Sequence, residues 1–250
     1  MQNKYNVIYL SPHLDDAALS CGGQIFQRTQ AGEAILILTI MAGDPPDGTF
    51  SAFAQELHDR WELANDMVTA RRDEDIHACY ILGADYLHWD IPDCIYRADA
   101  QTNEPFYPVW DKVIDRIHPQ EEQLMQQLAE QFATLPPAAQ ILTPLGVGNH
   151  VDHQIVRAAA ERCWANKLFY YEDYPYVQTT DTWENKFLGE KNWQATQIAL
   201  TPKALNVKAD AIMAFASQVS TFFNGRPDLE QQLKQYARRV GGERIWHQQE

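Results

Sequence analysis

Two short clusters of histidine and aspartate could together perform metal-dependent hydrolysis. The first, Ser11–Asp16 (Ser-Pro-His-Leu-Asp-Asp), follows an apolar run at Tyr5–Leu10, and the second, His150–His153 (His-Val-Asp-His), follows another at Gln140–Leu142. Neutral imidazoles and a carboxylate hold a divalent metal while leaving one position open for water, and a further carboxylate can act as a base. The residue types therefore predict one hydrolytic site assembled from both clusters.

The spacing within each cluster suits a shared site. His13 and Asp16 are three residues apart, as are His150 and His153, so each pair can project from one helical turn or tight loop toward a single point. Three protein ligands suffice for a catalytic zinc, which then lowers the pKa of its bound water toward about 7. The other members of the two clusters are free to transfer protons.

Apolar runs and helical periodicity outline the elements that must position these clusters. In the first half we expect strands at Val7–Leu10, Ala34–Met41 and Tyr86–Trp89, a helix over Ala17–Gln30, and a helical pattern from Ala52 to Leu82 that ends at Gly83. In the second half we expect strands at Gln140–Leu142, Leu168–Tyr171 and Thr196–Leu200, and helices over Glu121–Thr134, from His153 onward, and from Thr201-Pro202 to Val219.

This alternation predicts an α/β fold, namely a Rossmann-like, doubly wound and mainly parallel sheet with helices on both faces. Ligands of such sheets bind outside the carboxyl ends of the strands, where the strand order reverses. If the strand at Tyr5–Leu10 is central and the one at Gln140–Leu142 lies beside it across this switch point, both clusters open into one crevice.

Length and charge limit the classes of protein. A chain of 250 residues, 45% of them hydrophobic, is enough for one substantial core, so we expect a single domain over residues 1–250. The formal net charge of −14 argues against a nucleic-acid partner and against a polybasic membrane anchor, because both require basic surface. The net charge does not exclude a small basic pocket that binds a phosphorylated substrate, and it does not exclude a homo-oligomer.

The expected location is the cytoplasm. The apolar stretch at Val7–Leu10 is too short for a signal peptide or a membrane span. The four cysteines are scattered without CxxC spacing, which predicts free thiols in place of disulfides or a thiolate zinc site: Cys21, Cys79, Cys94 and Cys163.

Both clusters resemble the motifs of the LmbE-like, or PIG-L, zinc-dependent N-acetylglucosaminyl de-N-acetylases. The first motif of that family reads Pro/Ala-His-Pro-Asp-Asp-Glu and the second reads His-x-Asp-His, and they match Pro12–Asp16 and His150–His153 in the same order. This chain departs at Leu14, where the family has proline, and at Ala17, where it has glutamate. Weaker likeness continues at Arg71–Glu74 with Leu82-Gly83, at Ile91–Asp93, and at Lys208 with Ser217-Gln218.

The resemblance implies a role for each residue of the clusters. Zinc, or another divalent metal, would be held by His13, Asp16 and His153. Asp15 would be the general base for the attacking water, His150 would stabilise the developing oxyanion, and Asp152 would orient the His150 imidazole. Arg71 and Asp93 would lie near the substrate. The implied reaction removes an acyl group, chiefly acetyl, from an amino sugar or a small glycoconjugate.

Each of these residues also has an ordinary structural interpretation. Asp15 or Asp16 alone would be an N-cap of the following helix, Arg71 a solvated helix charge, and Asp93 a turn residue after Pro92. The segment Ile91–Pro108 is either a substrate loop or a surface excursion. The aromatic and acidic run Tyr170–Tyr176 either stacks on a sugar ring or ends a strand at a proline turn.

Three other functions compete with deacetylation of a sugar. One is hydrolysis of a non-sugar amide, because specificity resides in loops. Another is a catalytically silent metal- or carbohydrate-binding protein, which the presence of Asp15 disfavours because binding alone needs no base. The third is a nucleotide-binding Rossmann protein, and it is disfavoured because the turn after the first strand carries carboxylates in place of a glycine-rich phosphate loop.

We expect about one tightly bound divalent metal per chain, because the two clusters provide one set of three ligands. Elemental analysis of the purified protein measures this content, and His153→Ala should lower metal content and activity together. Protein that contains no metal and is not activated by added zinc would contradict the assignment. Activity that persists in His153→Ala after most of the metal is lost would exclude His153 as a ligand.

Overall fold

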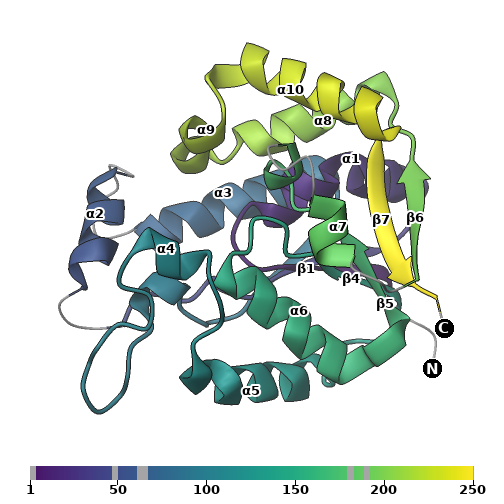
Figure 1. Ribbon diagram of the computed structural model, residues 1–250. Helices are drawn as coiled ribbons and strands as arrows, with labels where there is room; N and C mark the ends of the chain where they lie inside the picture. Colours follow the sequence, from purple (N-terminus) through teal and green to yellow (C-terminus); the bar gives the residue numbers. More distant parts are fainter. Residues whose placement is uncertain (1–3, 47–49, 61–66, 179–182, 189–191, 250) are drawn as a thin grey trace.

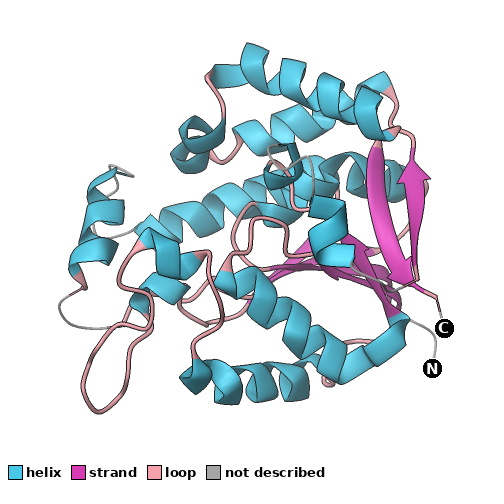
Figure 2. Cartoon of the chain, in the orientation of Figure 1, coloured by secondary structure: helices cyan, strands magenta, loops and turns pink. Residues whose placement is uncertain are grey.

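The computed structural model describes residues 4–46, 50–60, 67–178, 183–188 and 192–249. Within these ranges one seven-stranded sheet runs through the molecule, with the strand order β3-β2-β1-β4-β5-β7-β6 (Figures 1 and 2). The strands are β1 (Tyr5–Ser11), β2 (Ile35–Thr39), β3 (Asp85–His88), β4 (Ala138–Pro144), β5 (Leu168–Tyr171), β6 (Trp193–Ile198) and β7 (Glu243–Gln248). The pairs from β3 to β5 are parallel, whereas β7 is antiparallel to both β5 and β6.

Helices cover both faces of the sheet, as Figure 1 shows. They are α1 (Asp16–Gln30), α2 (Ala52–Arg60), α3 (Met67–Leu82), α4 (Trp110–Val113), α5 (Glu122–Phe132), α6 (Val151–Trp164), α7 (Trp183–Leu188), α8 (Pro202–Met213), α9 (Ala216–Phe222) and α10 (Gly225–Val240). The helices α1, α3 and α8 pack together above the sheet in this view, and α5 packs with α6 below it. The expected doubly wound α/β fold is therefore confirmed.

The central strand β1 is buried on both faces. Its residues Val7 and Tyr9 pack into a core with α1, α3 and α8, whereas Ile8 and Leu10 pack into the opposite core with α5 and α6. All four side chains are fully buried. A strand whose side chains point alternately into two apolar layers needs apolar residues at every position. This explains why apolar and polar residues do not alternate in this run.

The strand order reverses between β1 and β4. β1 pairs with β2 on one side and with β4 on the other, in parallel register that sets Tyr9 beside Leu142. The loops that follow β1 and β4 lead into α1 and α6, which start the crossovers in opposite directions along the sheet. The two histidine clusters therefore meet at the switch point, as the sequence predicts.

Several predicted boundaries need correction. The described parts of the helical pattern over Ala52–Leu82 are α2 and α3, and residues 61–66 between them lie outside the described ranges. The prediction of one helix from Thr201 to Val219 is wrong, because α8 ends at Met213 and a separate helix, α9, begins at Ala216. The last strand pair uses Trp193–Ile198, three residues earlier than expected at its start.

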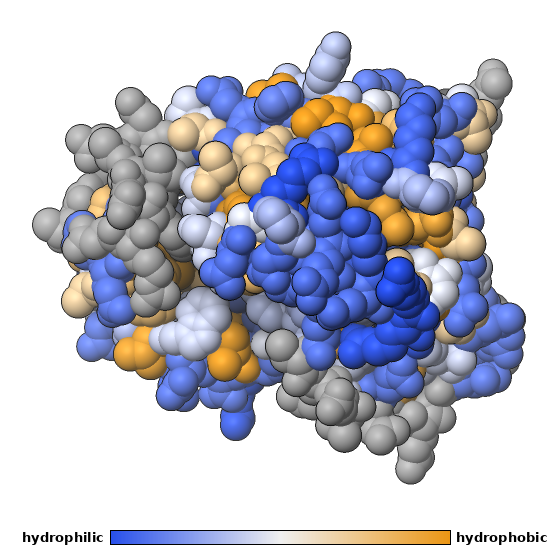
Figure 3. All heavy atoms as spheres, turned by 90° about the horizontal axis from the view of Figure 1, so that it is seen from above, coloured by the Kyte–Doolittle hydropathy of each residue, from blue (hydrophilic) through white to orange (hydrophobic). Residues whose placement is uncertain are grey.

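The four cysteines are free, as predicted: Cys21, Cys79 and Cys94 are buried and Cys163 is partly exposed. Among the described helices, none is both long and apolar enough to cross a bilayer. The face that looks upward from the view of Figure 1 is mostly hydrophilic, with apolar patches divided by polar side chains (Figure 3).

Two glycines in the loop between β4 and α6 offer a matched test of its geometry. Gly146 and Gly148 both have positive φ, 85° and 95°, so alanine at either position costs about 1–2 kcal/mol of backbone strain. An alanine Cβ at Gly148 would also lie 2.8 Å from Cγ of Tyr176, whereas nothing lies within 4 Å at Gly146.

We therefore expect Gly148→Ala to lower the free energy of unfolding by about 1–3 kcal/mol more than Gly146→Ala does, because overpacking adds to the strain. Urea denaturation of the two variants measures the difference. Equal losses would mean that Tyr176 does not pack against this loop as described.

Candidate active site

A tight turn at the end of β1 sets the first cluster. The Ser11 hydroxyl donates to the carbonyl of His13 at 2.7 Å and accepts the Ala17 N–H at 3.1 Å. The carboxylate of Asp16 accepts the His13 N–H at 2.8 Å. Ser11 thus satisfies the backbone N–H of Ala17 in the first turn of α1. Ala17 is the position where the resembled motif has glutamate, and here it takes part in the turn through its backbone.

Asp15 occupies the N-cap position of α1, yet its side chain makes no capping hydrogen bond. Its φ of 133° is in a region that L residues rarely adopt, and holding it there costs about 1–3 kcal/mol. The interpretation of Asp15 as a helix cap is therefore wrong. The turn bears this strain while the carboxylate lines a pocket with the histidines.

The three predicted ligands come together around one oxygen. Oδ2 of Asp16 lies 3.3 Å from Nδ1 of His13 and 3.2 Å from Nε2 of His153. The three rings of His13, His150 and His153 also contact one another, and nitrogen atoms from all three lie within 4.8 Å of one another. The donors fit a small divalent cation, because they combine two imidazoles with a carboxylate.

The far nitrogen of each ligand histidine is held by a buried carboxylate. Nε2 of His13 lies 3.0 Å from Oδ2 of Asp152, and Nδ1 of His153 lies 2.7 Å from Oδ1 of Asp173. An ionised carboxylate only accepts hydrogen bonds, so once each imidazole gives up one proton to make room for a cation, the proton that remains is on the nitrogen that faces Asp152 or Asp173. The nitrogens that face Asp16 then keep their lone pairs, which is the tautomer a metal requires.

The charges of Asp16 and of the neighbouring imidazoles shift each other's pKa. Burial raises the pKa of Asp16, but the His153 charge and hydrogen bonds from both histidines outweigh it and hold the pKa far below its ordinary value. Burial lowers the pKa of His153, but the Asp16 charge and hydrogen bonds to Asp16 and Asp173 raise it to about 10. Cation binding at these nitrogens therefore competes with protons.

Asp15 has a different environment from its neighbour. Burial, followed by the Asp16 charge, raises the pKa of Asp15 to about 8, against the opposing effect of the Arg71 guanidinium. Arg71 also donates to the carbonyl of Leu14 at 3.3 Å. A carboxyl group that exchanges its proton near neutral pH suits a general base that later acts as an acid.

His150 caps α6 with its own ring. Nδ1 accepts the N–H of Asp152 at 3.3 Å, so the proton of a neutral imidazole must be on Nε2. Burial, followed by the charge of His13, lowers the pKa of His150 to about 3. Asp152 thus contacts His150 through its backbone N–H, whereas its carboxylate bonds His13, Arg97 and the Cys94 N–H.

These side chains share a pocket of about 200 Å³. Seven of the eight predicted site residues line it, and the eighth, Asp152, is fully buried behind His13. Asp93 caps a short turn by accepting the Ile95 N–H at 3.1 Å, and its Oδ2 lies 3.5 Å from Nε2 of His13. The remaining wall is formed by Leu19, Leu57, Ile95, Trp110, Tyr176, Gln218, Thr221 and Phe222.

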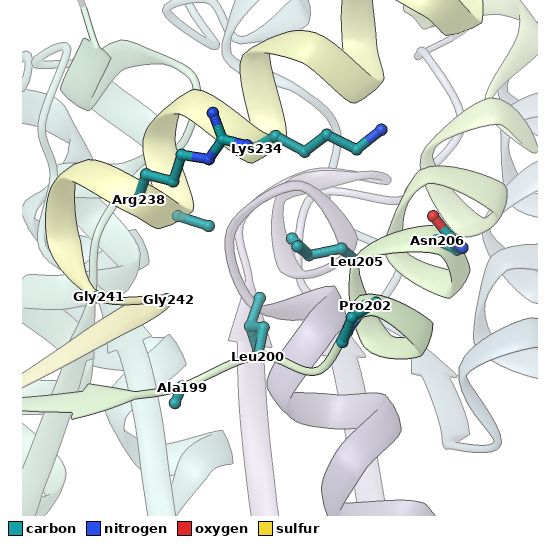
Figure 4. A pocket seen from close by; sticks show the side chains of 10 residues that line it. Ala199, Leu200, Pro202, Leu205, Asn206, Lys234, Arg238, Gly241 and Gly242 are labelled. Carbon is teal, nitrogen blue, oxygen red and sulfur yellow. The ribbon is translucent and has the colours of Figure 1, made fainter.

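A larger groove, of about 420 Å³, lies beside α8 and α10 (Figure 4). Its lining is mainly aliphatic with two cationic side chains, Lys234 and Arg238, and it includes no histidine, cysteine or carboxylate. Size alone therefore does not identify the reactive site. The smaller pocket is the candidate because it gathers the groups that bind metals and transfer protons.

Sequence reasoning missed Asp173, Arg97 and Glu121. Asp173 follows β5, which is the parallel neighbour of β4, so the strand-end rule that identified the two clusters could have identified it as well. Of the two interpretations of the run Tyr170–Tyr176, the end of a strand is right, since β5 ends at Tyr171, and sugar stacking is wrong for Tyr170, Tyr171 and Tyr174, which are buried. Tyr176 alone of these tyrosines lines the pocket.

Comparisons with known proteins agree with this arrangement. The family PIG-L, described as GlcNAc-PI de-N-acetylase, matches residues 8–164. A 2'-N-acetylparomamine deacetylase of Niallia circulans is 26% identical over 247 residues, which cover 89% of this chain and 84% of the relative.

Two solved structures are similar along nearly the whole chain. The zinc-inhibited form of teicoplanin deacetylase has a TM-score of 0.82 and 26% identity, covering 98% of both chains. The A40926 pseudoaglycone deacetylase has a TM-score of 0.77 and 26% identity, covering 99% of this chain and 98% of the other. These proteins are deacetylases, which are hydrolases that cleave amide bonds.

Asp173 offers a test of the tautomer argument. Its Oδ2 accepts the N–H groups of Gly146 and Val147 at 2.7 and 2.8 Å, so an asparagine here would keep its oxygen on those amides and turn its NH₂ toward His153. The NH₂ group would donate to Nδ1 and move the imidazole proton to Nε2. We expect Asp173→Asn to weaken zinc binding by about 10–100-fold.

Competition with a chelator measures zinc affinity in this variant, and thermal unfolding of the metal-free protein provides the control for folding. Wild-type zinc affinity in folded Asp173→Asn would show that Asp173 does not select the tautomer of His153.

Proposed function

Because this chain belongs to the PIG-L, GlcNAc-PI de-N-acetylase, family, we propose that it is a metal-dependent deacetylase that removes an N-acetyl group from an amino sugar or a sugar-bearing conjugate. One observation carries the proposal. Oδ2 of Asp16 lies between Nδ1 of His13 and Nε2 of His153, and a buried carboxylate binds the other nitrogen of each ring. This is the support that metal-binding histidines require.

In this proposal His13, Asp16 and His153 hold a divalent cation, for which zinc is the first choice. When bound, such a cation polarises a carbonyl and makes water a stronger nucleophile at neutral pH. The zinc-inhibited state of the similar teicoplanin deacetylase concerns that protein, and it supports testing zinc at both low and high concentration here.

The residues around the ligand set divide the proton transfers. Asp15, whose pKa is raised to about 8 by burial and by Asp16, takes the proton of the attacking water and returns it to the leaving amine. His150, neutral and protonated on Nε2, donates a hydrogen bond to the oxygen that becomes negative in the tetrahedral transition state. Because Nδ1 of His150 is held by the Asp152 N–H, its donor tautomer needs no rearrangement.

The pocket wall supports a sugar as the bound group. Asp93 and Arg71 place an acceptor and a donor of hydrogen bonds beside the cluster, and Trp110 offers an aromatic surface. Sugar rings present hydroxyl groups at their rim and apolar faces, which match such a combination. The relatives that are named for 2'-N-acetylparomamine and for teicoplanin act on sugar substrates, and this supports the same class here.

We also propose one domain over residues 1–250, since β1 and β7, far apart in the sequence, belong to the same sheet.

The direct experiment is a panel of substrates. Purified protein loaded with zinc is assayed for acetate and free amine from N-acetylglucosamine, its glycosides and larger N-acetylated glycoconjugates, with N-acetylated amino acids as non-sugar amides of the same bond type. Release from the sugars alone supports the proposal. Faster release from the non-sugar amides would overturn the substrate class, and zinc binding without release from any amide would favour a binding protein.

Asp15 and Asp16 provide the sharpest test of mechanism, because each substitution by asparagine removes one charge at neighbouring positions. Asp16→Asn should lose metal affinity, and excess zinc should restore part of its activity. Asp15→Asn should retain the metal but lose about 10²–10⁴-fold in kcat, the usual contribution of a general base, without rescue by zinc. Metal content and zinc titrations of activity measure both. The role assignment fails if Asp15→Asn is the variant that loses metal, or if the two variants respond alike.

A further inference from the structure

Arg97 is a buried cation in the loop between β3 and α4. Its Nε lies 2.8 Å from Oε1 of Glu121 and one terminal nitrogen lies 2.5 Å from Oδ1 of Asp152. The other terminal nitrogen donates to the carbonyl of Pro92 at 3.0 Å. The guanidinium therefore directs its planar array of donors at three oxygen acceptors and also at the sulfur of Met41, and its side chain is 8% exposed.

The Asp152 carboxylate that Arg97 contacts is completely buried. Arg97 occupies Oδ1, while Oδ2 accepts the Cys94 N–H at 3.0 Å and lies 3.0 Å from Nε2 of His13. With both oxygens of the carboxylate in use, the contacts with Arg97 and the Cys94 N–H fix the rotation of the Asp152 side chain that directs Oδ2 at the imidazole. Cys94 and Arg97 come from the same segment, Ile91–Pro108, whose role the sequence left open.

Glu121 completes the chain of contacts. It precedes α5 and is 2% exposed, and its carboxylate is held by the Nε of Arg97. The order Glu121, Arg97, Asp152, His13 alternates acceptor and donor at each contact, from the body of the protein to the pocket. Because Glu121, Arg97 and Asp152 are buried, the contacts among these three side chains are not exchanged readily for water.

We propose that Arg97, anchored by Glu121, is a positioning residue for the metal ligand His13, and that it acts by fixing the Asp152 carboxylate that sets the His13 ring and its tautomer. This inference rests on the proposed metal site. It assigns the first part of the Ile91–Pro108 segment to the support of a ligand, while Asp93 and Ile95 of the same segment face the pocket.

Stability alone gives little reason for such an arrangement. A buried ion pair contributes weakly to folding compared with apolar side chains of similar volume, since desolvation offsets its Coulomb attraction. A forked guanidinium, in contrast, fixes the orientation of the carboxylate it binds. Lysine at this position would keep the charge but could not span Glu121 and Asp152 with the same planar geometry.

The test measures zinc affinity of metal-free protein by competition with a chelator, with thermal unfolding as a separate readout. Arg97→Lys should bind zinc about 10–100-fold more weakly than the wild type, the usual effect of losing a partner behind a metal-binding histidine. Glu121→Gln, which keeps the side-chain volume, should lose affinity in the same direction by a smaller factor. Should Arg97→Lys fail to fold, Glu121→Gln carries the test.

Glu243→Gln is the matched control. Glu243 is also 2% exposed and forms a buried ion pair, 2.6 Å long, with Lys208. Its carboxylate accepts the N–H groups of Gly23 and Gln24 in the middle of α1, and it contacts none of the proposed metal ligands. It should lower the unfolding temperature while leaving zinc affinity unchanged.

Two results would overturn the inference: wild-type zinc affinity in the Arg97 and Glu121 variants, or an equal loss of affinity in Glu243→Gln. A wild-type protein that binds no zinc would instead refute the proposed function, before any variant is compared.

Discussion

The site depends on the parallel pairing of β1 with β4. Hydrogen bonds along these strands bring residues that are 139 positions apart, such as His13 and Asp152, to the same edge of the sheet. Because both strands run in the same direction, the loops that follow them leave the sheet at the same edge. β5 continues this arrangement by placing Asp173 at the end of the next strand. The ligands and their supports are therefore consequences of strand order.

This arrangement concentrates buried carboxylates at the ends of the strands. Asp15, Asp16, Asp152 and Asp173 are each at most 7% exposed, and unpaired charges at such depth are strongly unfavourable. The structure pairs three of them with histidines, adds Arg97 at Asp152, and sets Arg71 to oppose the field at Asp15. A divalent cation at the ligand nitrogens would stabilise the folded state further, since it binds that state preferentially.

Strands and helices with a clear apolar pattern could be predicted from the sequence. Leu168–Tyr171 is predicted to the residue, and the two apolar runs at β1 and β4 led to the switch point and hence to the ligand set. The break between α8 and α9 was missed because Ala214 and Phe215 continue the apolar character of the helix.

Residues that act through buried contacts were much harder to predict. Arg97 has the sequence context of a solvated loop charge, and only the folded chain shows that it lies between Glu121 and Asp152. Glu121 precedes a helix and would be taken for a favourable helix N-terminal charge. Such partners have no periodic spacing, because they come from different loops, so no local pattern identifies them.

Asp173 has a consequence for the dynamics of the pocket. One carboxylate receives the amides of Gly146 and Val147 and also the imidazole of His153. The loop after β4 cannot open locally without releasing the carboxylate from its amides, and this frees His153 to rotate. Ordering of the loop and alignment of His153 are therefore one cooperative event, and amide hydrogen exchange at these two positions reports on a side chain in the neighbouring helix.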